Sequence, residues 1–409
     1  MRRGPLPAGR GRCGVSRLGV DGAGQALTAM VYWLAANVCV QSPTITLTEA
    51  RMGREVPDQM MALVLTAPKE FEIRPIPTPN VGPMEVLCRV DAIAICGTDT
   101  EIIEGTYKGM WPRSYPFTPG HEWAGTIVEA SPGAIEFGFK VGDRVAGTSH
   151  SGCGYCQMCV TGRYNLCENY GNEKLGHRQY GHYTQGAYAQ YMLSTIKAIH
   201  KIPDSMTDEE GALVDTASIA LHSVKRPGIE PGDTVCVVGA GPMGVLVGEC
   251  ASALGAARVI LVGGGERLQR CKELFGYETF DRKSGDVVEG IRGMTGGRGP
   301  DVVVDCAGTE ESVKSAVEMV RKGGRVSFTG IPKDPTAIPF RKIVLQEIDL
   351  YGVRANRNTC QEVIPLVAAG KIRLKPLITH TFPLKDFATA LKVFNERIDG
   401  AMKVIVKPN

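Results

Sequence analysis

Short apolar runs separated by glycine- and proline-containing turns fill residues 60 to about 215. The strands expected there are EVLCRVDAIAI (85–95), WAGTIVEA (123–130) and AYAQYML (187–193). Short strands with turn signals between them are typical of an all-β domain. We therefore expect an all-β first domain over residues 60–217.

The pattern changes at EPGDTVCVVGAGPMG (230–244), where apolar strands begin to alternate with helical segments. The expected strands are TVCVVGA (234–240), RVILVG (258–263), DVVVDCAG (301–308), GRVSFTGI (324–331) and IDLYGVR (348–354). Such alternation predicts parallel βαβ units. Residues 218–353 are thus expected to form an α/β domain with a doubly wound parallel sheet.

Two amphipathic helices and a last strand do not continue this alternation. They are TCQEVIPLVAAGKI (359–372), FATALKVFNER (387–397) and MKVIVKP (402–408). We expect residues 354–409 to return to the first domain.

Residues 1–59 are expected to be a flexible or artefactual extension, with a mitochondrial presequence as the alternative. Their apolar stretch (29–40) is too short to cross a bilayer. They also account for the formal charge of +3, because they hold seven Lys/Arg and four Asp/Glu and leave 39 of each in the rest of the chain. A neutral body indicates no nucleic-acid or membrane partner.

Four cysteines crowd into HSGCGYCQMCVTGRYNLCEN (150–169): Cys153, Cys156, Cys159 and Cys167. A disulfide knot, plain loop cysteines and a metal site are the alternatives. The total of 13 cysteines is odd, and several others lie in apolar runs, which favours a reducing, cytoplasmic setting. Cysteines three apart suit four thiolates around structural Zn²⁺, a closed site that stabilises the fold.

A GxGxxG motif follows the first strand of the α/β domain and opens a helix, which is the setting that dinucleotide binding requires. Gly239 permits the turn, Gly241 lets the backbone approach a pyrophosphate, and Gly244 lets helix and strand pack closely. The motif also contains Pro242 and Met243. Backbone contacts from Ala307 and Gly330, at the ends of later strands, are expected to complete the cofactor site.

A second possible metal site is dispersed: AICGTD contains Cys96, and TPGHEWAG contains His121 and Glu122. A lone cysteine or a lone histidine more often has a structural role than a metal-binding one. Taken with the four-cysteine lobe and the glycine motif, and in this order, they make residues 60–409 resemble the zinc-dependent medium-chain dehydrogenases/reductases of the alcohol dehydrogenase superfamily, near the sorbitol and threonine dehydrogenase branch.

This resemblance implies a GroES-like catalytic domain, a Rossmann domain and a catalytic zinc between them. It makes Cys96, His121 and Glu122 ligands or near-ligands, and it puts Asp215 where the branch has a glutamate, 24 residues before Gly239. It further implies a homo-oligomer, either a dimer or a tetramer. A helix N-cap is the alternative role for Asp215.

The implied reaction interconverts a secondary alcohol and its ketone with NAD or NADP. The resemblance makes Thr98 the hydroxyl that takes the alcohol proton. Where many relatives carry a histidine to pass the proton on, this chain reads Asp99, Thr100, Glu101. The relay is therefore expected to end differently, through Glu101 or through water. The substrate is expected to be a polyol, sugar derivative or hydroxy amino acid, and a zinc-independent or non-catalytic relative such as a quinone-type reductase is the alternative.

The substrate-contacting Arg–Tyr pair of sorbitol dehydrogenases is replaced by Ala355 and Asn356. The neighbouring Arg354 and Arg357 are either contacts for a hydroxyl-rich or acidic substrate or ordinary surface charges.

Cofactor preference depends on the end of the second strand of the α/β domain. An NAD-preferring site has Asp or Glu there, but this strand ends in glycines that begin with Gly263. Arg267 and Arg270 follow, and either of them is expected to pair with a 2′-phosphate, whereas Glu266 is the alternative ribose ligand. We expect use of both cofactors, with a modest preference for NADP.

Overall fold

The computed structural model describes residues 56–107 and 109–409. Most of the expected amino-terminal extension, residues 1–55, lies outside this part of the chain. Within the described residues the first strand is β1 (Gln59–Ala67), which pairs with β2 (Glu70–Pro77) in a hairpin.

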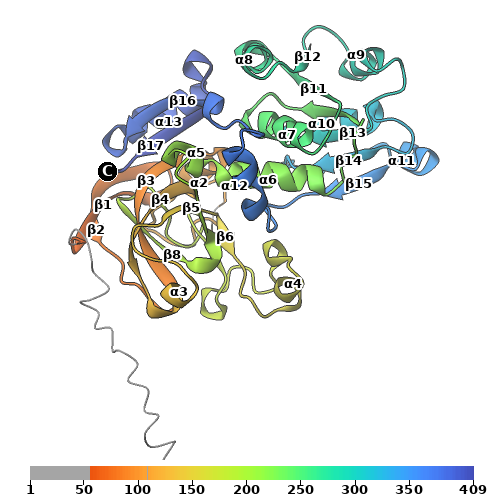
Figure 1. The fold of residues 1–409 in the computed structure, drawn as a ribbon. Coiled ribbons are helices and arrows are strands. Elements are labelled where there is room, and N and C mark those ends of the chain that lie inside the picture. Colours follow the sequence, from red (N-terminus) through yellow and green to blue (C-terminus); the bar gives the residue numbers. More distant parts are fainter. Residues whose placement is uncertain (1–55, 108) are drawn as a thin grey trace, which may run out of the picture. The chain divides into compact units, whose positions relative to one another are not determined.

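The first large sheet has the strand order β16-β17-β3-β4-β5-β9 (Figure 1). β8 pairs with the first half of β3, from Glu85 to Arg89, and β17 pairs with its other end. The strands of this sheet are β3 (Glu85–Ala94), β4 (Glu122–Ala130), β5 (Arg144–Gly147), β8 (Tyr191–Thr195), β9 (Ile199–Lys201), β16 (Ile378–Pro383) and β17 (Lys403–Lys407). A small separate pair consists of β6 (His150–Ser151) and β7 (Arg178–Gln179). Four short helices that the pattern did not predict interrupt this region: α2 (Gly97–Ile103), α3 (Pro132–Glu136), α4 (Gln157–Val160) and α5 (Asp208–Ala212).

The second sheet is entirely parallel, with the order β12-β11-β10-β13-β14-β15, which confirms the doubly wound α/β fold. Its strands are β10 (Thr234–Val238), β11 (Arg258–Gly263), β12 (Glu278–Asp281), β13 (Val302–Asp305), β14 (Arg325–Phe328) and β15 (Asp349–Gly352). Its helices are α6 (Val214–Lys225), α7 (Pro242–Ala253), α8 (Gly265–Phe275), α9 (Val287–Met294), α10 (Glu310–Met319) and α11 (Phe340–Gln346). β12 was not predicted, because its four residues ETFD carry no apolar run.

Both faces of this sheet are buried, as the alternation of side chains along β10 demonstrates. Val235 and Val237 belong to the core shared with α6 and α7, whereas Cys236 and Val238 belong to the core shared with α9 and α10. Neighbouring strand residues point to opposite faces of a sheet, so an uninterrupted apolar strand requires helices on both sides.

The carboxyl-terminal segment returns to the first sheet. β17 pairs with β3 (Ile405 opposite Ala94), while α13 (Phe387–Glu396) packs on β16 and β17 and α12 (Cys360–Ala368) packs on α6. The expected boundary between residues 217 and 218 falls inside α6, so a continuous helix joins the two sheets there rather than a loop.

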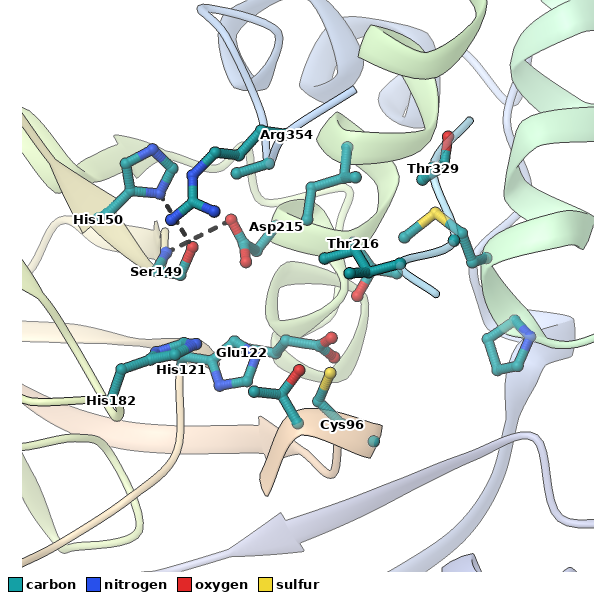
Figure 2. Close-up of a pocket in the computed structure, with 18 of the residues that line it drawn as sticks. Cys96, His121, Glu122, Ser149, His150, His182, Asp215, Thr216, Thr329 and Arg354 are labelled. Atoms are coloured by element: carbon teal, nitrogen blue, oxygen red, sulfur yellow. Dashed lines mark hydrogen bonds between the residues drawn. The ribbon is translucent and has the colours of Figure 1, made fainter. Parts of the chain in front are cut away.

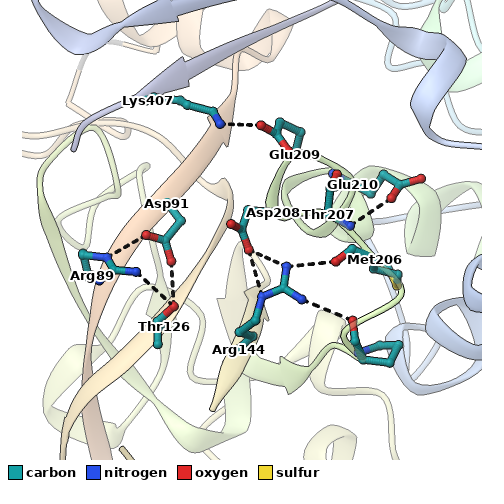
Figure 3. A network of polar contacts seen from close by, with 11 residues as sticks. Arg89, Asp91, Thr126, Arg144, Met206, Thr207, Asp208, Glu209, Glu210 and Lys407 are labelled. Carbon is teal, nitrogen blue, oxygen red and sulfur yellow. Dashed lines mark hydrogen bonds and ion pairs between the residues drawn. The ribbon is translucent and has the colours of Figure 1, made fainter. Parts of the chain in front are cut away.

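A polar network holds α5, the short helix that precedes α6, against the first sheet (Figure 3). Arg144 on β5 donates two hydrogen bonds to Asp208 on α5, at 2.6 and 3.1 Å, and one to the Met206 carbonyl at 2.9 Å. Lys407 on β17 binds the neighbouring Glu209. These contacts fix α5, and through it the first turn of α6, against the sheet. None of the helices within residues 56–107 and 109–409 combines the length and apolar character needed to cross a bilayer.

Candidate active site

The four-cysteine lobe brings its sulfurs together without a disulfide. Cys153 and Cys159 have their Sγ atoms 3.9 Å apart, Cys156 and Cys167 have theirs 3.8 Å apart, and all four lie within 4.8 Å of one another. Tetrahedral zinc with sulfur at about 2.3 Å has sulfur–sulfur edges of about 3.8 Å. The lobe therefore has the dimensions of a structural zinc site and not of a disulfide knot.

Cys96, His121 and Glu122 form a second donor group, although their segments are distant in sequence. β3 pairs with β4 so that Ala94 lies opposite Glu122, and Cys96 follows two residues after Ala94 at the N-cap of α2. The thiol, imidazole and carboxylate atoms lie within 4.8 Å of one another. Sulfur, nitrogen and oxygen donors at this spacing are a set that zinc binds.

Asp99 holds the His121 ring and was not among the expected site residues. Its Oδ1 lies 3.2 Å from His121 Nδ1, and its Oδ2 accepts hydrogen bonds from the Tyr188 hydroxyl and the Cys96 N–H, both at 2.9 Å. Although burial opposes ionisation, the His121 ring and these hydrogen bonds lower the pKa of Asp99. A carboxylate on one ring nitrogen leaves the other available to a metal. The sequence feature that could have identified Asp99 is its position three residues after Cys96.

Glu122 is also held by another residue. Lys403 on β17 donates a hydrogen bond to the Glu122 carboxylate and another, at 3.2 Å, to the Thr216 hydroxyl on α6. Burial, the largest single effect, lowers the pKa of Lys403, but the charge and hydrogen bond of Glu122 together with the nearby Cys96 and Asp99 outweigh it, so the net effect is a raised pKa. The ammonium group is thus the buried counter-charge of Glu122.

Asp215 lies in the same cavity, outside the group of three donors. Figure 2 shows it near Ser149 and Arg354, on the other side of the pocket from Cys96. It accepts hydrogen bonds from Asn356 Nδ2 at 2.8 Å and the Ser149 N–H at 3.4 Å. Burial, together with the nearby Glu122 charge, raises its pKa to about 6.

These side chains surround a cavity of about 510 Å³ between the two sheets. One wall is a series of rings in which neighbouring centroids lie 4.7 to 4.8 Å apart, running from Tyr107 through Trp111 and His182 to His121. Thr98, Pro242, Met243 and Gly330 also line the cavity. Part of the expected cofactor site therefore faces the donor group directly.

Comparison with known proteins identifies the family. Residues 82–204 match the alcohol dehydrogenase GroES-like domain, and residues 242–369 match the zinc-binding dehydrogenase domain. The sorbitol dehydrogenase of Bacillus subtilis is 33% identical over 88% of this chain and 100% of its own length. The chain belongs to the zinc-binding alcohol dehydrogenase family.

Other relatives of this zinc-binding dehydrogenase agree. The L-idonate 5-dehydrogenase of Vitis vinifera is 31% identical over 87% of the chain and 97% of its own length. The crystal structure of a zinc-binding dehydrogenase from Sinorhizobium meliloti 1021 bound to NADP superimposes with a TM-score of 0.78, at 31% identity, over 86% of this chain and 100% of that one. The predicted family, zinc dependence and NAD(P) linkage are thereby confirmed.

The dehydrogenase has a second cavity, of about 390 Å³, at the carboxyl ends of β10, β11 and β13. Gly239, Gly241, Gly263 and Ala307 line it. Gly239 has a φ of +123°, and a Cβ on Gly244 would lie 1.8 Å from the Gly239 carbonyl oxygen. The motif glycines are therefore needed for the turn and for close packing, and a Cβ on Gly241 would meet only open space. A cradle of this kind fits a dinucleotide pyrophosphate.

Arginines surround this cavity, but not all of those expected. Arg267 lines it and donates to the Ala401 carbonyl at 3.0 Å, while burial and the charge of Arg397 lower its pKa to about 10. Arg270, one turn further along α8, is not part of the lining, because its guanidinium turns to the Asp399 carbonyl at 3.3 Å. Arg282 and Arg397 line the cavity instead and were not predicted.

Asn356 and Lys403 were not predicted as site residues. Lys403 lines the cavity, whereas Asn356 is fully buried and donates to Asp215. Both come from segments far from their partners in the sequence, so only the folded structure reveals these contacts. A lysine inside the apolar run MKVIVKP was the one available signal for Lys403.

Proposed function

We propose that the protein interconverts a secondary alcohol of the polyol or sugar class and its ketone, using NAD or NADP. One observation carries this proposal: the Cys96–His121–Glu122 group and the helix of the glycine motif, through Pro242 and Met243, line one cavity. A metal held by the donor group and a cofactor bound at the glycine motif would therefore share one cavity. The relatives named sorbitol dehydrogenase and L-idonate 5-dehydrogenase support a polyol-type substrate.

When bound, zinc supplies Lewis-acid polarisation of the alcohol or ketone oxygen, and the nicotinamide carries the hydride. Cys96 and His121 hold the metal, and Asp99 orients His121. Glu122 remains paired with Lys403. We propose that Asp215 acts on the donor group through a water molecule, since it lies outside that group.

The chain's own residues provide a route for the proton. Thr98 Oγ1 would take the proton of the substrate hydroxyl and release its own hydroxyl proton to the next acceptor in the cavity. Tyr107 lines the same cavity, and its hydroxyl donates a hydrogen bond of 2.7 Å to Glu101 Oε2. The Glu101 side chain is 31% exposed, so it connects the cavity wall to solvent. We propose that Glu101 ends the relay in place of the histidine of many relatives.

The remaining proposals follow from charge and topology. A cavity with Arg267, Arg282 and Arg397 and no carboxylate at Gly263 supports use of both cofactors with a modest preference for NADP. The sheet membership of the strands supports the division into residues 60–217, 218–353 and 354–409, with α6 shared. Free cysteines throughout the described residues support a cytoplasmic location. We also propose a homo-oligomer, as expected from the sequence.

The deciding experiment is a cofactor-reduction screen over polyols, sugar acids, sugar phosphates, hydroxy amino acids and simple secondary alcohols, with NAD and NADP separately. We expect turnover to be highest with a polyol derivative and to disappear in Cys96→Ser. Quinone reduction that persists in Cys96→Ser, with no alcohol oxidised by either protein, would contradict the proposal.

A further inference from the structure

A smaller cavity of about 290 Å³ adjoins the active-site cavity and is lined by four arginines. Arg163 comes from the four-cysteine lobe, Arg226 follows α6, and Arg354 and Arg357 follow β15. Among the described residues, neither aspartate nor glutamate lines it. Arg354 and Asn165 line both cavities, so the two share a wall.

Neutral groups hold these arginines in position. The guanidinium carbon of Arg354 lies 5.1 Å from the centre of the Tyr170 ring, and that of Arg226 lies 5.8 Å from the centre of the Tyr351 ring. Arg357 donates through Nε to the Gly162 carbonyl at 3.1 Å.

Two arginines elsewhere in the chain show the contrast with an ion-paired guanidinium. Arg144 binds Asp208 at 2.6 Å and Arg325 binds Asp233 at 2.8 Å. In the part of the chain that the structure describes, no ion pair of this kind neutralises the four arginines of the small cavity. Several positive charges around one cavity repel one another, so an anion bound there would be stabilised by all of them.

Two buried acceptors complete the wall. His222, 5% exposed, directs Nδ1 to the Ala355 carbonyl at 2.7 Å, so Nδ1 carries the proton and Nε2 accepts. Asn165, also 5% exposed, donates its amide to the Arg354 carbonyl at 2.9 Å and keeps Oδ1 as an acceptor. Within the described residues, neither His222 Nε2 nor Asn165 Oδ1 has a hydrogen-bond partner. Burial and the charges of Arg226 and Arg357 lower the pKa of His222, which keeps its ring neutral.

Together these groups offer guanidinium donors for oxyanions beside acceptors for hydroxyl hydrogens. Guanidinium groups bind phosphate and carboxylate through paired hydrogen bonds. We propose that this cavity binds the acidic end, a terminal phosphate or carboxylate, of a polyol-type substrate whose reacting carbinol lies in the active-site cavity. Arg354, which lines both cavities, contacts the substrate between its two ends. The inference rests on the proposed function and narrows its substrate to acidic polyols.

The kinetic test compares a matched pair, sorbitol and sorbitol 6-phosphate, in the full-length enzyme. We expect kcat/KM to be higher for the phosphate ester. In Arg163→Gln and Arg226→Gln, the ratio of kcat/KM for the ester to that for sorbitol should fall about tenfold, as for loss of one charged hydrogen bond. Arg341→Gln removes the same charge from an exposed site on α11 and should leave the ratio unchanged. The same comparison is made with gluconate in place of sorbitol 6-phosphate, to test a carboxylate instead of a phosphate.

A binding test separates this proposal from the proposed function, because it needs no turnover. Inorganic phosphate is titrated against the protein at constant ionic strength, with chloride as the reference, and the melting temperature is recorded. We expect a phosphate-specific rise that is reduced in the Arg163→Gln/Arg226→Gln double variant and retained in Arg341→Gln.

The outcomes divide cleanly. No phosphate-specific rise and no preference for the ester would overturn the anion site. A rise that depends on the arginines, with sorbitol and its phosphate used equally, would overturn its assignment to the substrate and indicate a site for a free anion. Arginine-dependent binding without oxidation of any alcohol would contradict the proposed function and leave the anion site supported.

Discussion

Lys403 donates a hydrogen bond to the Glu122 carboxylate, and each side chain is only 4% exposed. The two residues are 281 positions apart, and they meet because β17 inserts beside β3. Each is the charge that makes burial of the other tolerable. The pair therefore joins the last strand of the chain to the metal-donor group.

Replacing Lys403 by Met should lower the free energy of unfolding by about 3 kcal/mol, because the Glu122 carboxylate would remain buried without its partner. Urea denaturation measures this loss. Lys403→Arg should retain most of the stability, and adding Glu122→Gln to Lys403→Met should restore part of it. If Lys403→Met were as stable as the wild type, the Lys403–Glu122 pair would make no such contribution to the free energy of unfolding.

The two sets of cysteines should respond differently to the same change. Cys96→Ser removes a donor beside the cavity, so turnover should disappear while the melting temperature stays near that of the wild type. Cys156→Ser breaks the four-thiolate lobe, so it should lower the melting temperature and cause the loss of one equivalent of bound zinc. Zinc analysis and thermal unfolding on both variants test this separation. Equal loss of activity and of stability in the two would contradict it.

Glu101 should carry the proton out of the cavity. In Glu101→Gln, kcat for alcohol oxidation near neutral pH should fall at least about tenfold and recover at high pH, where hydroxide replaces the acceptor. Tyr107→Phe should behave similarly. Glu104→Gln is the matched control. Glu104 lies three residues after Glu101, and its exposed carboxylate pairs with Lys69. A flat ratio of variant to wild-type kcat across pH would exclude Glu101 from the relay.

Cofactor choice should depend on Arg282. Replacement by Ala should reduce kcat/KM for NADP about tenfold and that for NAD less than about twofold, since only NADP offers a 2′-phosphate. Arg270→Ala, outside the cavity, should have little effect on either. A thousand-fold preference of the wild type for NAD would defeat this prediction and indicate Glu266 as the ribose ligand.

His200 should make the fold sensitive to acid. It lies on β9, away from both metal-donor groups, and burial lowers its pKa from 6.5 to about 4. Below pH 6.5 the unfolded chain binds a proton that the folded one refuses, so stability is lost as the pH falls from 6.5 towards 4. The full loss is about 3 kcal/mol by linkage. His200→Gln should therefore show a shallower decline of melting temperature over this range and an unchanged slope above it. An identical decline in both proteins would contradict the assignment.

Much of the fold was predictable because its signals are local. The strand around Cys236, the turn at Gly239 and the four-cysteine spacing each follow from a few adjacent residues. β12 was missed because ETFD has no apolar run, and α2 was missed because its seven residues follow directly on a strand.

The site was only partly predictable, because its remaining members are set by packing across the chain. Nothing beside Lys403 indicates that it meets Glu122, and nothing beside Asn356 indicates Asp215. Arg270 was expected from its distance along the chain, but one helical turn directs it to the Asp399 carbonyl rather than to the cofactor cavity. Sequence spacing fixes which residues are near, whereas tertiary contacts decide which way they point.

The order of the first sheet has a consequence for synthesis of the protein on the ribosome. β8 covers β3 from Glu85 to Arg89, whereas the end of β3 nearest Cys96 pairs with β17, whose residues are made after the nucleotide-binding half. Until then, that end of β3 has an open hydrogen-bonding edge, which is the kind of surface on which nascent chains aggregate. The donor group therefore acquires its counter-charge and its final strand together, only after the nucleotide-binding half has been translated.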